Sequence, residues 1–182
     1  MPGARITSGE RVTLRTVEEE DTAFHQRAFA NPQIRYPIGN PLRNREGIDP
    51  PDEDDGDQFL VCIDDDAGPG SPYEDEVTRI GVVYVGDADW RRPELGYWLV
   101  PEEHGNGYGT ESVALVIDYV FRTYDHPAVG AVAYDYNDAS RGLLESLGFA
   151  EEGRIRKDRF IDGEYRDTVQ YGLLRSEWRD RG

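Results

Sequence analysis

The sequence predicts an α+β protein built on one mixed β-sheet of six to seven strands, flanked by about four helices. In the first half of the chain, short apolar runs separated by turns indicate antiparallel strands. Near the middle, a strand, a helix and a second strand follow one another, and a connection of that length implies a parallel pair. Two extended stretches around Asp162-Gly163 then predict a closing hairpin.

The N-terminal part predicts one strand and one helix. Residues 11–17 alternate apolar side chains such as Val12 and Leu14 with polar ones, as a half-buried strand does. Residues 18–29 follow as a helix with acidic residues in its first turn. We expect Asn31-Pro32 to end this helix, because the residue before a proline avoids the helical conformation. Residues 1–9 are expected to form an N-terminal extension outside the domain.

The segment from residue 36 to residue 57 has poor periodicity, four prolines and an acidic run at its end. It predicts a loop with at most a short helix. The acidic run indicates a solvated surface, since it lacks the ligand spacing of a calcium loop. Strands are expected over residues 59–63 and 78–86, separated by a polar turn at 64–76.

The centre of the chain carries the most informative pattern. Residues 94–100 are aromatic and aliphatic and predict a strand, and residues 110–123 carry apolar side chains at the spacing of a helix with one buried face. Gly105, Gly107 and Gly109 lie between them. A glycine loop that opens a helix presents free N–H groups at the positive end of the helix dipole, so this segment is expected to bind phosphate.

The same residues allow other interpretations. A plain turn between a strand and a helix is common. A P-loop would need Gly-Lys-Ser/Thr at its end, and a dinucleotide fingerprint would need G-x-G-x-x-G. Neither pattern is present in this loop.

The C-terminal part predicts a strand over residues 128–136, a helix over 138–147 and a hairpin formed by 149–160 and 164–174. Asn137 or Asp138 suits the N-cap of that helix, and Gly148 suits its end. We expect a single domain over residues 10–178, followed by a tail at 179–182.

The charge balance is unusual. There are 37 acidic and 20 basic residues, which give a formal net charge of −17, and Lys157 is the only lysine. Self-repulsion of this size destabilises a compact state in dilute salt, but the Debye length falls to about 3 Å near 1 M salt. The composition therefore indicates a halophilic protein from a haloarchaeon, with an acidic protein that binds cationic partners as the alternative. Nucleic-acid binding is not expected.

Features that the sequence lacks indicate where the protein is located and which ligands it does not bind. A membrane span is not expected, because no apolar run is long enough, and the N-terminus shows no secretory signal, so a cytoplasmic location is expected. The single cysteine, Cys62, excludes an internal disulfide and a cysteine-rich zinc site, and no metal site is expected. We expect a monomer or a homodimer.

The central loop resembles a known family. The sequence H-G-N-G-Y-G at residues 104–109 is similar to the acyl-CoA pyrophosphate loop of the GNAT superfamily of N-acetyltransferases, Gln/Arg-x-x-Gly-x-Gly/Ala, with histidine in the first position. Asn137 to Ser140 with the later Leu-Gly-Phe at 147–149 resembles the second motif of the family, and the C-terminal hairpin resembles its RimJ/RimL branch. The resemblance covers roughly residues 10–178 and is weak between residues 36 and 76.

The resemblance implies a GNAT fold in which acetyl-CoA lies where the strands 94–100 and 128–136 splay apart. The loop amides would hold the pyrophosphate, the N–H of Leu99 or Val100 would polarise the thioester carbonyl, and Asn137 would bond the pantetheine arm. The residues expected to contact the cofactor are Leu99, Val100, His104, Gly105, Asn106, Gly107, Tyr108, Gly109, Thr110, Asn137 and Ser140.

The resemblance also implies the catalytic groups. An amine must be neutral to attack a thioester, and Glu94 is the first candidate for the carboxylate that takes its proton, with Asp135 second. Ser140 is expected to donate to the leaving sulfur, because Leu144 stands where many relatives carry a tyrosine. The alternatives are a solvated charge at a strand end for Glu94 and helix-capping roles for Asn137 and Ser140.

Together these points predict an acetyl-CoA-dependent N-acetyltransferase that acts on a primary amine. A protein N-terminus is the leading acceptor, and a small-molecule amine or an antibiotic is the next. A non-catalytic sensor of acyl-CoA built on the same fold is the alternative from another class.

Overall fold

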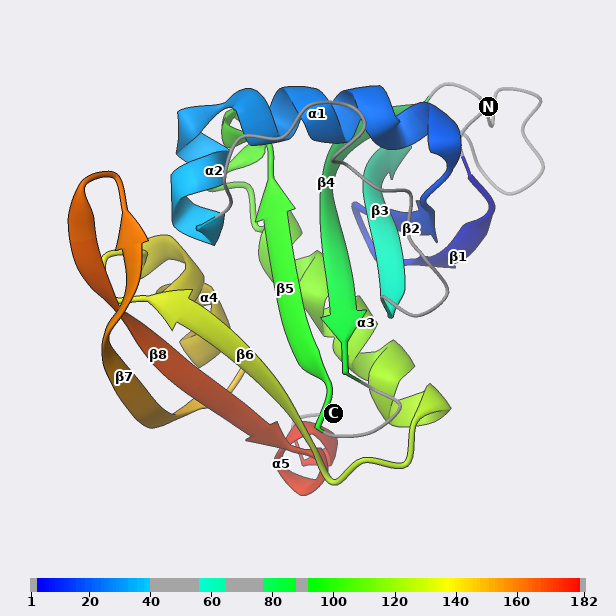
Figure 1. Cartoon of the computed structure of the whole chain (residues 1–182). Helices are drawn as coiled ribbons and strands as arrows, with labels where there is room; N and C mark the ends of the chain where they lie inside the picture. The colour runs from blue at the N-terminus through cyan, green and yellow to red at the C-terminus, as the bar shows by residue number, and fades with distance from the viewer. Residues whose placement is uncertain (1–2, 40–55, 65–76, 88–91, 181–182) are drawn as a thin grey trace.

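The computed structural model describes residues 3–39, 56–64, 77–87 and 92–180, and these form one α+β unit around an eight-stranded mixed sheet (Figure 1). The strand order is β1-β2-β3-β4-β5-β6-β8-β7. The strands are β1 Arg5–Ser8, β2 Thr13–Thr16, β3 Asp57–Asp64, β4 Val77–Gly86, β5 Glu94–Leu99, β6 Ala128–Tyr134, β7 Ala150–Ile161 and β8 Glu164–Leu174. The helices are α1 Thr22–Ala30, α2 Pro32–Ile38, α3 Tyr108–Thr123, α4 Asp138–Ser146 and α5 Arg175–Arg179, with 3-10 turns η1 Glu19–Asp21 and η3 Pro101–Glu103.

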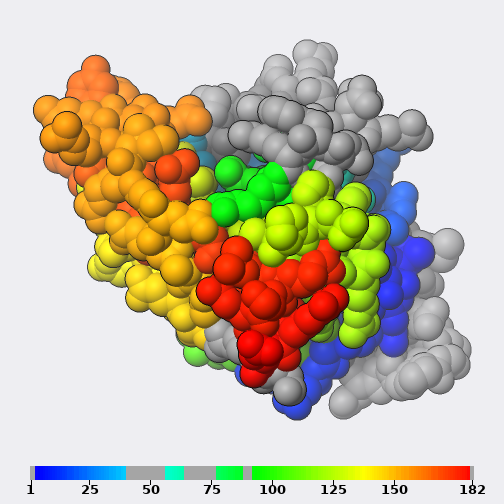
Figure 2. Space-filling model, turned by 90° about the horizontal axis from the view of Figure 1, so that it is seen from below, coloured from blue at the N-terminus to red at the C-terminus, as the bar shows by residue number. Residues whose placement is uncertain are grey.

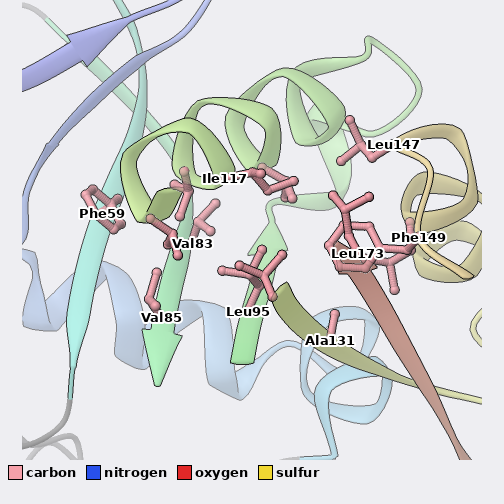
Figure 3. Packing of buried hydrophobic residues seen from close by; sticks show 14 of the residues in the cluster. Phe59, Val83, Val85, Leu95, Ile117, Ala131, Leu147, Phe149 and Leu173 are labelled. Carbon is pink, nitrogen blue, oxygen red and sulfur yellow. The ribbon is translucent and has the colours of Figure 1, made fainter. Parts of the chain in front are cut away.

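The core lies on both faces of the sheet. On one face, Val113, Val116, Ile117 and Val120 of α3 are fully buried against the strands, as their spacing predicted. Figure 3 shows Ile117 among strand residues such as Val83, Val85 and Leu95. On the other face, residues of α1 and α2 pack against a second apolar cluster that includes Trp98. Burial of this apolar area is the main force that holds the layers together.

The predicted fold class is confirmed, although the described residues contain one more strand and one more helix than expected. The additional strand is β1, which pairs antiparallel with β2 through Arg5↔Arg15 and Ser8↔Thr13. It lies in the segment that the sequence placed in an N-terminal extension. Its four residues include one apolar side chain, Ile6, which is 39% exposed, so an edge strand without a buried face left no alternating pattern to read.

The helices differ from the prediction in two places. Asn31-Pro32 ends α1 as expected, but it also begins α2: the Asn31 Oδ1 accepts a hydrogen bond from the Gln33 N–H at 3.0 Å, and Pro32 occupies the first helical position. Residues 36–38, where a loop with at most a short helix was expected, form the last part of α2, which is capped by Gly39 with φ +67°. Most of the loop expected up to residue 57, including most of its acidic run, lies outside the described residues.

The second difference is α5, where the sequence predicted no helix; it spans the last residues of the expected domain and the first residue of the expected tail. The Trp178 indole N–H donates to the Asp118 carboxylate of α3 at 2.8 Å, which fixes α5 against that helix. In Figure 2 the red C-terminal residues lie beside the yellow-green segment that contains α3. Within the described part of the chain, no helix is both long and apolar enough to cross a bilayer.

The parallel pair β5 and β6 splays apart, as predicted. The two strands pair only at Glu94↔Gly130 and Leu95↔Ala131, and beyond these residues they diverge (Figure 1). Each strand remains held by its outer neighbour: β5 pairs with β4 as far as Gly81↔Leu99, and β6 pairs with β8 as far as Tyr134↔Thr168. The opening between them is therefore a fixed feature of the sheet.

Candidate active site

A cavity of about 870 Å³ occupies this opening. Its walls come from β5, β6, α2, α4 and the segment that leads into α3. The described lining residues include two carboxylates, Glu94 and Glu103, but no lysine or arginine. With no such cation in the described lining, backbone N–H groups, the helix dipole and neutral side-chain donors are what remains to hold an anion there.

Side-chain alternation along β5 gives the cavity two different sides, because successive residues of a strand point to opposite faces of the sheet. Trp98 packs with Phe24 and Phe29 of α1, so Glu94 and Gly96 also face the layer of α1 and α2. Leu95, Tyr97 and Leu99 belong to the cluster around α3 and α4. The gap between β5 and β6 connects the two sides.

The loop before α3 has the geometry predicted for an anion site. Gly105 and Gly107 have φ values of +79° and +82°, which favour glycine. The first helical hydrogen bond is donated by the Glu111 N–H to the Gly107 carbonyl at 3.1 Å, so the N–H groups of residues 108–110 have no acceptor within the helix. A Cβ at Gly105 would meet nothing within 4 Å, which leaves space for a phosphate close to the backbone. These residues fit the diphosphate of coenzyme A.

Leu99 and Val100, at the end of β5, were the two candidates for the N–H that polarises the thioester carbonyl, but their N–H groups point in opposite directions. The Val100 N–H donates to the Ile80 carbonyl at 2.7 Å and is therefore engaged with β4. Because backbone groups alternate between the two edges of an antiparallel strand, the Leu99 N–H points to the other edge, into the opening. The prediction that the Val100 N–H could polarise the thioester carbonyl is therefore wrong, and the Leu99 N–H remains the candidate.

His104, which was expected to contact the cofactor, makes a contact within the protein. Its Nε2 lies 3.0 Å from the Leu99 carbonyl oxygen. A carbonyl oxygen only accepts hydrogen bonds, so Nε2 must carry the proton. The ring thus ties the loop to the end of β5.

The N-terminus of α4 brings Asn137 and Ser140 to the cavity. The Asn137 Oδ1 accepts a hydrogen bond from the Ser140 N–H at 3.1 Å, which is an N-cap, and its Nδ2 donates to the Pro37 carbonyl of α2 at 3.4 Å. The Ser140 hydroxyl lies 2.8 Å from the Tyr97 hydroxyl. Burial raises the pKa of Tyr97 to about 12 although its hydrogen bond to Ser140 lowers it, so the phenol stays protonated at neutral pH.

The two candidate carboxylates lie in different places. Glu94 lines the cavity on the side of α2, close to Tyr84, and no described residue forms a hydrogen bond or an ion pair with its side chain. Asp135 follows the last residue of β6 and does not line the cavity; its Oδ1 is buried without a hydrogen-bond partner among the described residues. The fold therefore brings Glu94 and Ser140 to one cavity and leaves Asp135 outside it.

Sequence reasoning missed several cavity residues. Tyr84, Tyr97 and Tyr134 line the cavity, as do residues of α2 such as Ile34 and Pro37. The aromatic residues of the two central strands were visible in the sequence, but which of them faced the site depended on the pleat of each strand. No cluster of three or more potential metal ligands occurs in the described residues.

The splayed parallel pair, with a glycine-rich helix N-terminus at its open end, fits an acyltransferase that uses a coenzyme A thioester. The model of the acetyltransferase (GNAT) domain matches residues 11–150, and the chain belongs to this family. It is an N-acetyltransferase that uses acetyl-CoA. This outcome favours the enzyme over the non-catalytic sensor.

The chain is similar to acetyltransferases with a named substrate and to others whose substrate is not named. The chain is 26% identical over 177 residues to the SPbeta prophage-derived uncharacterized N-acetyltransferase YokL of Bacillus subtilis, with 94% of each chain covered. It is 36% identical over 88 residues, 48% of each chain, to the putative ribosomal N-acetyltransferase YdaF of the same organism. A spermidine N-acetyltransferase from Vibrio cholerae, crystallised with CoA and spermine, has a similar fold, with a TM-score of 0.79 at 21% identity over 94% of this chain and 99% of that one.

Proposed function

We propose that this enzyme transfers acetyl directly from acetyl-CoA to a primary amine within a ternary complex, and that a protein N-terminus is its leading acceptor. The observation that supports direct transfer is the position of Glu94 and Ser140 on opposite sides of one cavity. An amine that enters from the side of α2 meets Glu94, and a thiol that leaves on the side of α4 meets Ser140. The similarity to the putative ribosomal N-acetyltransferase YdaF supports a RimJ/RimL-type acceptor.

The cofactor-binding roles follow from the backbone. The N–H groups of Gly105 to Thr110 would hold the diphosphate, and the Leu99 N–H would polarise the thioester carbonyl. When bound, acetyl-CoA supplies an activated acyl group. Asn137 would contact the pantetheine arm while it caps α4, since its Nδ2 makes only a long bond of 3.4 Å to Pro37.

The acceptor amine must lose a proton before it attacks. A peptide α-amino group has a pKa of about 8 and is roughly a tenth neutral at pH 7, whereas a lysine amine, with a pKa of about 10.4, is neutral in well under a thousandth. A weak base is therefore enough for an N-terminal substrate. Glu94, directly or through water, would take this proton.

The leaving thiolate must gain a proton, and the proton that the amine loses balances it; Ser140 would hydrogen-bond the sulfur and relay a proton to it while its own hydroxyl is restored. The Tyr97 hydroxyl lies 2.8 Å from the Ser140 hydroxyl, where either group can donate, and it also donates to the Ser140 carbonyl at 3.2 Å. When the phenol donates to the serine hydroxyl, the serine proton is free to point toward the sulfur. A thiol pKa of about 8.5 means that this transfer can follow bond breaking.

A small polycationic amine is the second candidate acceptor. The cavity carries two carboxylates and the rings of Tyr84 and Tyr134, and its described lining contains no lysine or arginine. Such a lining attracts cations by charge and by cation–π contact. The similarity in fold to an enzyme crystallised with spermine motivates the same test.

Release of CoA thiol with a panel of amines tests the proposal. The panel contains a peptide with a free N-terminus, the same peptide N-terminally blocked but with a lysine, and spermidine. We expect the free peptide to be the best substrate, and we expect Glu94→Gln to lower kcat/KM roughly 100-fold or more with each acceptor. Preference for spermidine would replace the leading acceptor, and full activity of Glu94→Gln would exclude Glu94 as the base.

We further propose that the enzyme works in a salt-rich cytoplasm, as the net charge of −17 and the near-absence of lysine suggest. The same assay, run from 0.1 to 2 M KCl, should show activity that rises with salt as self-repulsion is screened. Activity that falls steadily over this range would contradict this adaptation.

A further inference from the structure

The turn between β1 and β2 touches the start of α3, about 100 residues away in the chain. The Arg11 N–H donates to the Glu111 Oε1 at 2.8 Å, and the Arg11 Nε donates to the Glu111 Oε2 at 3.0 Å. The Val12 N–H donates to the same carboxylate at 3.3 Å. Glu111 thus binds both the backbone of the turn and its arginine.

Arg11 also contacts the loop itself. Its Nη1 donates to the Asn106 carbonyl at 2.6 Å, and its guanidinium lies over the Tyr108 ring, 5.3 Å from the ring centre. Its Nη2 would lie 3.0 Å from a Cβ built on Gly107. The guanidinium therefore packs against three consecutive residues of the loop.

These contacts fix the direction of a backbone donor. In a trans peptide the carbonyl and the following N–H point in opposite directions, and the described chain contains no cis peptide. Because Arg11 holds the Asn106 carbonyl, the Gly107 N–H is turned away from Arg11. Gly107 lines the cavity, so the hydrogen bond orients one donor of the anion site.

Arg11 also compensates the negative charge of Glu111. A carboxylate in the first turn of α3 is stabilised by the helix dipole, but it would repel an anion bound at the same N-terminus. Burial raises the pKa of Glu111, but the hydrogen bonds from Arg11 and Val12 and the charge of Arg11 outweigh it and lower the pKa overall. The carboxylate is therefore ionised at neutral pH, and the guanidinium at 3.0 Å compensates its charge.

We propose that Arg11 and Glu111 form a latch that holds the diphosphate loop in its binding conformation, so that Arg11 is a positioning residue for coenzyme A. This inference rests on the proposed diphosphate site. The alternative is that Arg11 contacts the phosphates directly. The two hypotheses predict different effects of Glu111→Gln on CoA binding. If Arg11 and Glu111 form a latch, loss of the carboxylate loosens the loop and weakens binding. If Arg11 contacts the phosphates directly, loss of the carboxylate frees its positive charge and does not weaken binding.

Calorimetric titration tests the latch without any acceptor. CoA and pantetheine, which lacks the diphosphate, serve as the two probes. Arg11→Ala and Glu111→Gln are each expected to raise the Kd for CoA about tenfold and to leave the Kd for pantetheine unchanged. Arg79→Ala is the matched control, since Arg79 forms ion pairs with Glu20 and Asp21 and does not line the cavity; its Kd for CoA should equal that of the wild type.

Each other result has a defined meaning. The Arg11 side chain is half-exposed and exposed ion pairs add little stability, so the variant is expected to fold. Unchanged or tighter CoA binding by Glu111→Gln would overturn the latch. An equal rise in the Kd values for CoA and pantetheine would mean that Arg11 only supports the structure and does not position the diphosphate loop. A wild-type protein that does not bind CoA would instead reject the diphosphate site itself.

Discussion

Gly105→Ala separates the two roles that a glycine can have in the loop before α3. Gly105 has φ +79°, a conformation that alanine adopts only with strain, and a Cβ there would enter open space within the cavity. Gly163, in the turn between β7 and β8, is a matched control. It has φ +82°, its Cβ would also meet nothing within 4 Å, and it does not line the cavity.

The stability cost of the two substitutions should be the same. Left-handed backbone costs a residue with a Cβ about 1–2 kcal/mol. For a domain of this size, that corresponds to a fall in Tm of roughly 2–8 °C. No further cost from steric overlap is expected at either position, because neither Cβ has a neighbour within 4 Å.

The effect on cofactor binding should differ. A methyl group at residue 105 keeps a phosphate from approaching the loop amides. A hydrogen bond to a charged group contributes about 1.5–3 kcal/mol, so the loss of one raises the Kd roughly 10- to 100-fold. Gly163→Ala leaves the loop unchanged and should bind CoA like the wild type.

Thermal unfolding and calorimetric titration with CoA measure the two quantities on the same samples. We expect similar falls in Tm for both variants and weaker CoA binding for Gly105→Ala alone. If Gly105→Ala bound CoA as tightly as Gly163→Ala, the diphosphate would not approach this residue, and the assignment of the loop would be refuted.

Two further predictions concern Ser140, the proposed proton donor, and a buried histidine. Ser140→Ala should lower kcat about 100-fold while the KM for acetyl-CoA changes little, as steady-state kinetics with a fixed acceptor would reveal; an unchanged kcat would remove Ser140 from the mechanism. His25 is 8% exposed, its ring contacts Phe24 and Trp98, and burial lowers its pKa although Asp21 opposes the shift. The unfolded chain then binds a proton below the ordinary pKa of 6.5 more readily than the folded one, so stability should fall as the pH drops from 6.5 to 5. His25→Leu should reduce this loss in urea unfolding at pH 5 and pH 8, and an equal loss in both proteins would contradict the assignment.

Local sequence patterns determined a large part of the fold. The helical spacing of Val113, Val116 and Ile117 predicted the buried face of α3, and Asp162-Gly163 predicted the turn between β7 and β8. Each of these signals depends on residues within one or two helical turns, or on the backbone conformation that a single residue permits. The edge strand β1 could not be found in this way, because its extended conformation comes from pairing with β2.

The features of the candidate site likewise fall into those that the local sequence determines and those that depend on the tertiary structure. The sequence by itself determined that glycines precede a helix between two strands, and therefore that unpaired N–H groups gather there. Only the tertiary structure decided that the Val100 N–H binds Ile80, that Glu94 and Ser140 lie on opposite sides of one cavity, and that Arg11 reaches Glu111. These facts depend on strand register, on the face that each pleat presents and on contacts between distant segments. Such features arise only when the whole sheet assembles, because residues nearby in the chain do not specify them.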